Sequence, residues 1–433
     1  MNIYTYPSAE AEQRVNDTIK RGLGYTPEQV TAVEDYLKEV ELKGDDALVA
    51  YTNRFDSEQV TRETLRVSEQ EFETALNQVD DAFSKALERA VDQIRSFHER
   101  QRENSWIDTP RKGVMLGQMV QPVEAAGVYV PGATGGKTPL VSSVLMGGIP
   151  AKVAGVESIS LMTPPMADGT VNPYILTAAR RVGIDSVFKA GSAWAIAALA
   201  YGTQQVPKVD VIVGPGNIWV TLAKKLVSGT VGIDMIAGPS EILIIADENA
   251  RPDYIAADLL SQAEHDEVAS SILVTTSEKL ANQVSQSVAS QLAALSRKEI
   301  ASASIERFGT ILVTPDMETA VALSNRLAPE HLELMVANPF EWVGQIRNAG
   351  AVFMGDYTPE PMGDYIAGPN HVLPTAGTAR FSSALSVEHF TKKTSLIHYS
   401  KAAFEKEAAD VEALAHIEGL GAHARSVSIR KEK

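Results

Sequence analysis

The chain has 433 residues, a formal net charge of −16 and no cysteine. This length suffices for two or three core-forming units, and no apolar run is long enough to span a bilayer. The acidic balance, without a basic tail or stripe, argues against binding to nucleic acid or to an anionic membrane. The lack of cysteine excludes disulfides, thiolate metal sites and cysteine nucleophiles.

The first residues, "MNIYTYPSAEAEQ", contain neither a basic segment nor an apolar segment of the kind found in secretory signals. We therefore expect a cytoplasmic protein. A helix is predicted over residues 25–55, with Thr26 as its N-cap. A longer helix is predicted from Ser68, which forms a capping box with Glu71 and precedes apolar residues at every third or fourth position as far as Phe97. Both helices should pack on a core, and His98 at the end of the second should be structural.

From about residue 123, short apolar runs alternate with helical patterns. Strands are predicted at "GVYV" (127), "SISLMT" (158), "SVFKA" (186) and "VDVIVG" (209), then at "EILIIAD" (241), "SSILVTT" (270), "GTILVTP" (309) and "AVFMGD" (351). This alternation predicts parallel sheets covered by helices, in two α/β units. No G-x-G-x-x-G motif follows any of these strands, so the common dinucleotide fingerprint is absent. After about residue 385, a helix near "KAAFEKEAADVEALAHIEG" and an alternating segment, "LGAHARSVSIR", predict a tail with its own helix and strand.

The stretch "GVYVPGATGGKTPL", residues 127–140, looks like a triphosphate-binding loop. The spacing argues against this interpretation, because Pro131 stands where the first glycine of G-x-x-x-x-G-K-[ST] is required and has no N–H group. We expect instead a glycine-rich turn between a strand and a helix, which can bring backbone close to another phosphate or to a substrate.

Several histidines lie beside oxygen-bearing side chains. Gln262 and His265 are three positions apart, so on a helix they would share one face. The loop "MGDYTPEPMGDYIAGPNHVLP" contains carboxylates and a histidine between glycines and prolines, and such rigid carboxylates suit a hard or borderline cation: Asp356, Glu360, Asp364 and His371. A set of nitrogen and oxygen ligands compatible with zinc can be drawn from these stretches and the tail: Gln262, His265, Asp364 and His423, the last preceded by Glu418. The alternative is a solvated helix face and ordinary loop residues.

The segment "NRLAPEHLEL" suggests a catalytic pair. Pro329 fits the first position of a helix, which would place Glu330 and His331 in its first turn. The positive end of the helix dipole would keep His331 neutral and able to accept a proton. The alternative is an ordinary helix start with an exposed histidine.

Three Gly-Pro loops add amides or a hydroxyl that a turn alone does not require. They are "GPGN" at 214, "GPSE" at 238 and "GPNH" at 368, with Asn217, Ser240 and Asn370. Two of them adjoin predicted parallel strands, where α/β proteins bind ligands. Simple turn formation is the alternative.

Taken together, these blocks resemble the histidinol dehydrogenase family along nearly the whole chain. The matching blocks are "GVYVPG", "VDVIVGPGN", "IDMIAGPSE", "DLLSQAEHD", "LAPEHLEL", "GDYTPEPMGDYIAGPNHVLPT" and "EGLGAHARSVSIR". The resemblance implies oxidation of L-histidinol to L-histidine in two NAD-linked hydride transfers, one zinc ion per active site and a homodimer with shared active sites. It implies an α/β fold with two Rossmann-like parallel-sheet units, an N-terminal helical segment and a C-terminal tail that spans the dimer. We divide the chain into an arm (1–24), a first α/β domain (25–127 with 242–384), a cofactor-side α/β domain (128–241) and the tail (385–433).

The resemblance also implies roles for individual residues. The zinc ligands would be Gln262, His265, Asp364 and His423, with His423 and Glu418 supplied by the partner chain. Glu330 would activate water and His331 would act as general base. The substrate would contact the zinc ligands and four further residues, Ser240, His331, His371 and Glu418. The cofactor would contact Tyr129, Asn217 and the position of Trp194, where the family commonly has Gln and where indole stacking would replace the amide.

Other functions stay open at this point. A zinc- and NAD-dependent dehydrogenase of another small alcohol, such as a sulfopropanediol, could use the same scaffold, although Glu418 would repel a sulfonate. A zinc hydrolase would form product without NAD, and a triphosphatase would need Lys137. A binding protein without catalysis would do none of these.

Overall fold

The computed structural model describes residues 1–21, 24–133 and 138–431. Lys137, the lysine of the phosphate-loop motif, lies outside the described residues. Contacts within the chain form two units: residues 1–101 with 124–390, and residues 102–123 with 391–433. No helix of the described chain combines the length and the hydropathy needed to cross a bilayer.

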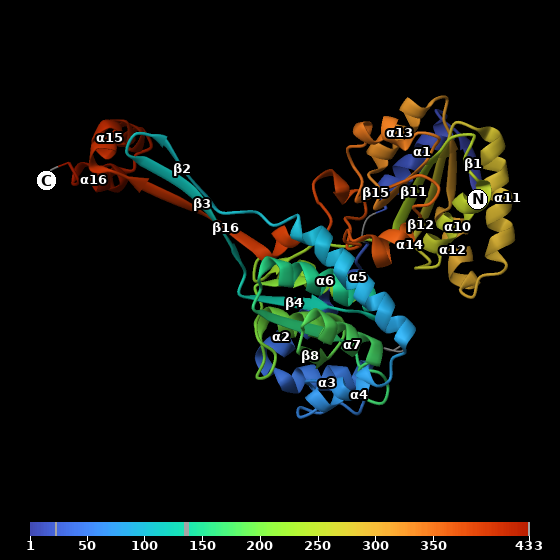
Figure 1. The fold of residues 1–433 in the computed structure, drawn as a ribbon, viewed down its shortest axis with the longest axis horizontal. Helices are drawn as coiled ribbons and strands as arrows, with labels where there is room; N and C mark the ends of the chain where they lie inside the picture. The colour runs from blue at the N-terminus through green and yellow to red at the C-terminus, as the bar shows by residue number, and fades with distance from the viewer. Residues whose placement is uncertain (22–23, 134–137, 432–433) are drawn as a thin grey trace. The chain divides into compact units, whose positions relative to one another are not determined.

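The first unit contains a six-stranded parallel sheet (Figure 1). Its strands, in spatial order, are β1 (Asn2–Thr5), β13 (Thr310–Val313), β12 (Ser270–Thr275), β11 (Glu241–Ala246), β14 (His331–Met335) and β15 (Ala351–Met354). Alternate residues of the buried strand β11 point to opposite faces. Ile242 and Ile244 pack under one set of helices, α10 (Pro252–Ala263), α11 (Glu278–Leu292) and α12 (Lys298–Phe308). Leu243 and Ile245 pack under α1 (Ala9–Ile19) and α13 (Met317–Leu327).

A second parallel sheet, of five strands, belongs to the same unit. Its order is β10 (Gly232–Ile233), β9 (Val211–Val213), β4 (Ala125–Tyr129), β7 (Ser158–Thr163) and β8 (Ser186–Lys189). The helices between these strands are α6 (Val141–Ala154), α7 (Pro173–Val182), α8 (Ser192–Tyr201) and α9 (Ile218–Val227), and a short pair, β5 (Gly132–Ala133) and β6 (Thr138–Pro139), follows β4. The α/β fold with parallel sheets predicted from the alternating pattern is thereby confirmed.

The N-terminal helices also pack beside this second sheet. α2 (Pro27–Lys43) contacts α8, α4 (Glu69–Leu76) contacts α7, and α5 (Asp81–Glu99) contacts α6, while α3 (Asp45–Phe55) lies next to α2 and α8. These helices thus pack on helices of the second sheet, whereas the domain division expected from the sequence groups them with the first sheet.

The two predicted N-terminal helices are each divided. The capping boxes at Thr26 and Ser68 are present, but the first helix breaks at Gly44, whose φ of 59° lies in the left-handed region. The second breaks before Asp80, whose carboxylate accepts a hydrogen bond from Phe83 N at 2.7 Å and so begins a new helix.

The second unit is a three-stranded antiparallel sheet with two helices. β3 (Val114–Pro122) lies between β2 (Trp106–Arg111) and β16 (Thr391–Tyr399), followed by α15 (Lys401–Ile417) and α16 (Gly421–Ser428). Arg111 of β2 forms an ion pair with Glu407 of α15 at 3.1 Å, which joins the sheet to the helix. The strand predicted from the alternating "LGAHARSVSIR" is wrong: the segment forms α16, because small residues such as the buried Ala424 let a short helix pack on α15.

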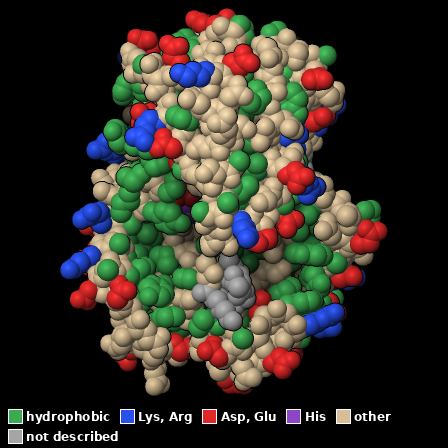
Figure 2. Space-filling view, turned by 90° about the vertical axis from the view of Figure 1, so that its right-hand side faces the viewer, with side chains coloured by type: hydrophobic (Ala, Val, Ile, Leu, Met, Phe, Trp, Pro, Cys, Tyr) green, Lys and Arg blue, Asp and Glu red, His purple; other side chains and the backbone are tan. Residues whose placement is uncertain are grey.

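Short helical turns complete the first unit: η1 (Pro339–Glu341), η2 (Val343–Gln345), α14 (Glu360–Met362), η3 (Gly363–Ala367), η4 (Thr378–Arg380) and η5 (Val387–Phe390). On the face shown in Figure 2, Lys and Arg side chains are scattered among Asp and Glu. That face shows no concentration of one sign of charge.

Candidate active site

Glu330 and His331 lie at the amino end of β14, and not in a helix. α13 ends at Leu327, and Ala328 adopts a left-handed φ of 52° that turns the chain away from the helix. Pro329 follows, and His331 is the first residue of the buried strand, paired with Ile242 of β11 and Ala351 of β15. The predicted helix start is therefore wrong: the run "HLELM" is buried between two parallel strands, which outweighs the helix-start signal of Pro329.

The backbone of Glu241 holds both side chains. Its N–H donates to Glu330 Oε2 at 2.8 Å, and its carbonyl oxygen lies 2.9 Å from His331 Nδ1. Because a carbonyl only accepts hydrogen bonds, His331 Nδ1 carries the proton and Nε2 keeps its lone pair. Nε2 has no hydrogen-bond partner within the described part of the chain. His331 is thus oriented as a proton acceptor at Nε2.

Burial sets the protonation of this pair. His331 is 4% exposed and Glu330 7%. Burial lowers the pKa of His331, and it raises the pKa of Glu330 well above its usual value, with Glu241, Asp364 and Glu360 adding repulsion. His331 is therefore neutral, as expected, but the cause is desolvation and not the dipole of a helix.

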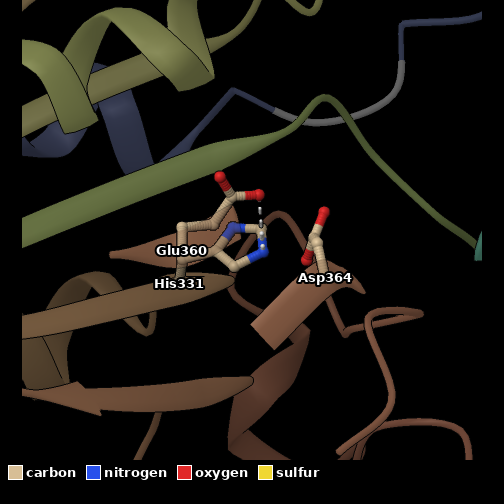
Figure 3. A group of neighbouring side chains, drawn as sticks. All are labelled: His331, Glu360 and Asp364. Carbon is tan, nitrogen blue, oxygen red and sulfur yellow. Dashed lines mark ion pairs between the residues drawn. The ribbon is translucent and has the colours of Figure 1, made fainter. Parts of the chain in front are cut away.

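Asp364 faces His331 from a π-helical turn (Figure 3). The turn, η3, follows α14, and it approaches β15 so closely that a side chain at Gly363 would clash with the ring of Phe353. Asp364 lies 3.7 Å from His371 Nδ1, and Glu360 lies 3.9 Å from His331 Nε2. Ligand atoms of His331, Glu360 and Asp364 all lie within 4.8 Å of one another, close enough to share one cation.

Glu360 had no predicted role beyond its place among the loop carboxylates. It is 3% exposed, and burial with repulsion from Asp364 raises its pKa to about 9. Its backbone N–H donates to Glu333 at 3.0 Å, and Glu333 faces Asp258, whose pKa burial raises to about 6. The spacing of Asp258 and Glu333 in sequence gives no sign of this cluster, because the two lie on different elements.

Gln262 and His265 lie one turn apart at the end of α10. Gln262 is 1% exposed, and its Oε1 has no partner among the residues described. A buried amide oxygen without a partner is costly, and a cation would satisfy it. Burial lowers the pKa of His265 and Asp364 opposes that shift, as it does at His331, so this carboxylate is close to both imidazoles. The residues fit a cation with nitrogen and oxygen ligands.

The Gly-Pro loops border this region. Ser240 immediately precedes Glu241 and is half-buried. Asn370 anchors its loop on α6 by donating to Met146 O at 2.7 Å. His371 Nε2 is buried without a hydrogen-bond partner in the described chain. Glu418 and His423 belong to the second unit, at the end of α15 and on α16, and their assigned roles stay predictions.

The cofactor candidates lie at the carboxyl edge of the second sheet. Tyr129 ends β4, and its hydroxyl accepts a hydrogen bond from Ser192 N, at the start of α8, at 3.0 Å. Asn217 caps α9, with Oδ1 accepting from Trp219 N at 3.1 Å and Val220 N at 3.3 Å. Helix N-termini at the carboxyl ends of parallel strands suit anionic phosphates.

A family model described as "Histidinol dehydrogenase" matches residues 21–431. The histidinol dehydrogenase of Desulfotalea psychrophila is 56% identical over 400 residues, covering 92% of each chain. That of Halalkalibacterium halodurans is 52% identical over 421 residues, covering 96% of this chain and 98% of its own.

The chain belongs to the histidinol dehydrogenase family. The crystal structure of histidinol dehydrogenase from Elizabethkingia anophelis agrees with this chain at a TM-score of 0.93 and 39% identity, covering 100% of this chain and 98% of that one. The resemblance drawn from the sequence blocks is confirmed by these comparisons.

Trp194 lies at the position where the resemblance leads us to expect Gln. The indole is 5% exposed and stacks on Phe55 and Tyr51, with ring centroids 5.1 and 5.8 Å apart. Its Nε1 is near Asp56, without a hydrogen bond of normal length. Trp194 thus fills the core behind the carboxyl edge, and stacking on a cofactor is limited to the small part of the ring that core aromatics leave uncovered.

Proposed function

We propose that this protein oxidises L-histidinol to L-histidine through the aldehyde, with two molecules of NAD+ and one zinc ion per active site. The family membership and the chemistry of the site support this function. The observation that carries it is the pair Glu330 and His331, held by the backbone of one residue with His331 Nε2 free beside Asp364.

His331 serves as the base for the first oxidation. The alcohol must lose its hydroxyl proton as the carbon loses a hydride, and a neutral imidazole with a free Nε2 accepts that proton. The hydrogen bond from Nδ1 to the Glu241 carbonyl stabilises the imidazolium that forms.

Glu330 serves in the second oxidation, which requires water to add to the aldehyde. With no cysteine in the chain, a thiohemiacetal is excluded and the hydrate must be the species oxidised. Burial raises the pKa of Glu330, so its carboxylate, once ionised, is a stronger base toward water.

Gln262, His265 and Asp364, with His423 of a second chain, would hold the zinc. We favour this set over one with His331 and Glu360, because the unpartnered Oε1 of Gln262 needs a cation and the base must keep Nε2 free. When bound, zinc would orient the substrate's nitrogen atoms and polarise its oxygen.

Ser240, His371 and Glu418 would contact the substrate, and Tyr129 and Asn217 the cofactor, with Trp194 supporting them from the core. Glu418, like His423, would come from the partner in a homodimer. A carboxylate at this position suits the ammonium group of histidinol and would repel a sulfonate.

NADH formed per L-histidinol tests the proposal, on zinc-loaded protein and on protein stripped of metal. Two NADH per substrate are expected, lost on chelation and restored by zinc, with no NADH from sulfopropanediol. Glu330→Gln should give one NADH while aldehyde accumulates, because water is no longer activated. A wild-type enzyme that stops at the aldehyde would contradict the role of Glu330.

A further inference from the structure

Arg21 forms a buried ion pair next to the site. It follows α1, and its Nη2 donates to Glu241 Oε1 at 3.0 Å, with the two side chains only 11% and 12% exposed. The guanidinium also lies over the ring of Phe308, 5.1 Å from its centroid. Arg21 is thus held between the first strand residue of β11 and the end of α12.

Glu241 links this ion pair to the catalytic residues. Its side chain is anchored twice, by Arg21 and by Ala376 N at 3.3 Å. Its backbone N–H and carbonyl hold Glu330 and His331. A displacement of Glu241 therefore moves the hydrogen-bond partners of both catalytic side chains together.

We propose that Arg21 is a positioning residue for both oxidation steps, acting through Glu241. This inference rests on the proposed function. Without Arg21, the buried carboxylate of Glu241 loses its compensating charge and is driven toward water or a proton, which shifts the start of β11. Misplacement of a catalytic group by about 1 Å can cost on the order of a hundredfold in rate. Both oxidations should slow, because Glu330 bonds the displaced N–H and His331 bonds the displaced carbonyl.

Arg21→Met, Arg21→Lys and Glu241→Gln test the inference, with Arg14→Met as the matched control. Arg14 lies on α1, the helix that precedes Arg21, and joins it to β13 through Thr310 Oγ1 at 2.8 Å and to α12 through Arg307 O at 2.9 Å. Steady-state kinetics would be measured with L-histidinol and with L-histidinaldehyde, and thermal unfolding would report folding.

Arg21→Met should lower kcat roughly ten- to hundredfold with both the alcohol and the aldehyde, and change KM for either substrate less. Arg21→Lys should recover part of the rate, and Arg14→Met should keep the wild-type kcat. If Arg21→Met does not fold, Glu241→Gln decides, with a lower kcat expected.

Wild-type kcat in Arg21→Met or in Glu241→Gln, or equal losses in Arg21→Met and Arg14→Met, would overturn the inference. The proposed function fails separately, if wild-type enzyme does not oxidise L-histidinol.

Discussion

Apart from the added edge strand β1, the two parallel sheets of the first unit arrange their strands in the same spatial order. Their candidate functional residues, however, lie at opposite edges. In the first sheet, Glu241 and His331 are the first residues of β11 and β14, so the candidate catalytic groups lie at the amino ends of the strands. In the second sheet, Tyr129 and Asn217 lie at the carboxyl edge, next to the N-termini of α8 and α9.

The difference reflects what each edge offers. At the carboxyl edge of the second sheet, the positive ends of α8 and α9 suit a dinucleotide's phosphates, while Ser192 N and Trp219 N already bond Tyr129 and Asn217. At the amino edge of the first sheet, pairing of β11 with β14 begins only at Ile242, which leaves the peptide groups of Glu241 to bind side chains. At the carboxyl edge of the same sheet, the carboxylate of Asp247 accepts a hydrogen bond from the backbone N–H of Ala337, which follows β14. The fold alone therefore does not indicate which edge of a parallel sheet holds the catalytic residues.

The largest expected effect is at the amino edge of the first sheet. His331→Asn removes the group that accepts the alcohol proton, so kcat should fall by roughly 10²- to 10⁴-fold. The pH–rate profile should lose its acidic limb, because that limb reports protonation of this imidazole. Because burial lowers the pKa of His331, the wild-type limb should lie below the usual range for histidine.

His389→Asn is the control. His389 accepts a hydrogen bond from Ser386 N at 3.1 Å at the turn η5, and it belongs to neither group of candidate site residues. It should leave kcat and the pH profile unchanged. An unchanged rate and profile in His331→Asn would remove this residue from the mechanism and with it the assignment of catalysis to the amino edge.

Much of this arrangement follows from the sequence, because local patterns carry it. Strands such as "EILIIAD" and helices such as that at 173–182 are predicted where they occur, since apolar period and turn residues agree there. Glu330 and His331 are found as a pair, but their secondary structure is mispredicted, because Pro329 fits a helix start as well as an entry into a strand. Only the neighbouring strands decide between the two.

Contacts between distant segments are not predictable from a single sequence. The link of Arg21 to Glu241 spans 220 positions, and neither residue type nor spacing signals it. The burial of Trp194 is likewise not predictable from its local sequence, because the aromatic residues that cover it come from α2 and α3. The presence of Trp194 in the sequence therefore does not show where its side chain lies.

A smaller effect is expected from Asp56, at the carboxyl edge of the second sheet beside Gly191 N. Burial raises its pKa from 3.8 to about 6. The folded state thus holds this proton more tightly than the unfolded chain, a stabilisation that is complete below pH 3.8 and lost as pH rises through about 6. As pH rises, the free energy of unfolding of Asp56→Asn should therefore increase relative to that of wild type. The difference should reach up to about 3 kcal/mol once the wild-type carboxyl is fully ionised.

Urea unfolding of both proteins between about pH 4 and about pH 8 would measure this gain. Asp168→Asn is the control, because hydrogen bonds from Thr170 lower the pKa of Asp168, and it should show no such gain with rising pH. A stability difference between Asp56→Asn and wild type that does not vary with pH would mean that the carboxyl does not titrate as described.

The smallest expected effect comes from removing a helix cap at the carboxyl edge of the second sheet. Asn217→Ala removes the cap of α9 and should cost about 1 kcal/mol of stability. It should also raise KM for NAD severalfold with little change in kcat, because the affected N–H groups face the cofactor edge. Asp316→Ala removes the corresponding cap of α13, where Oδ1 accepts from Thr319 N at 2.7 Å, and should destabilise the protein without changing KM for NAD. Equal KM values in both variants would show that capping of α9 serves stability alone, and the cofactor would then have to be sought at another edge.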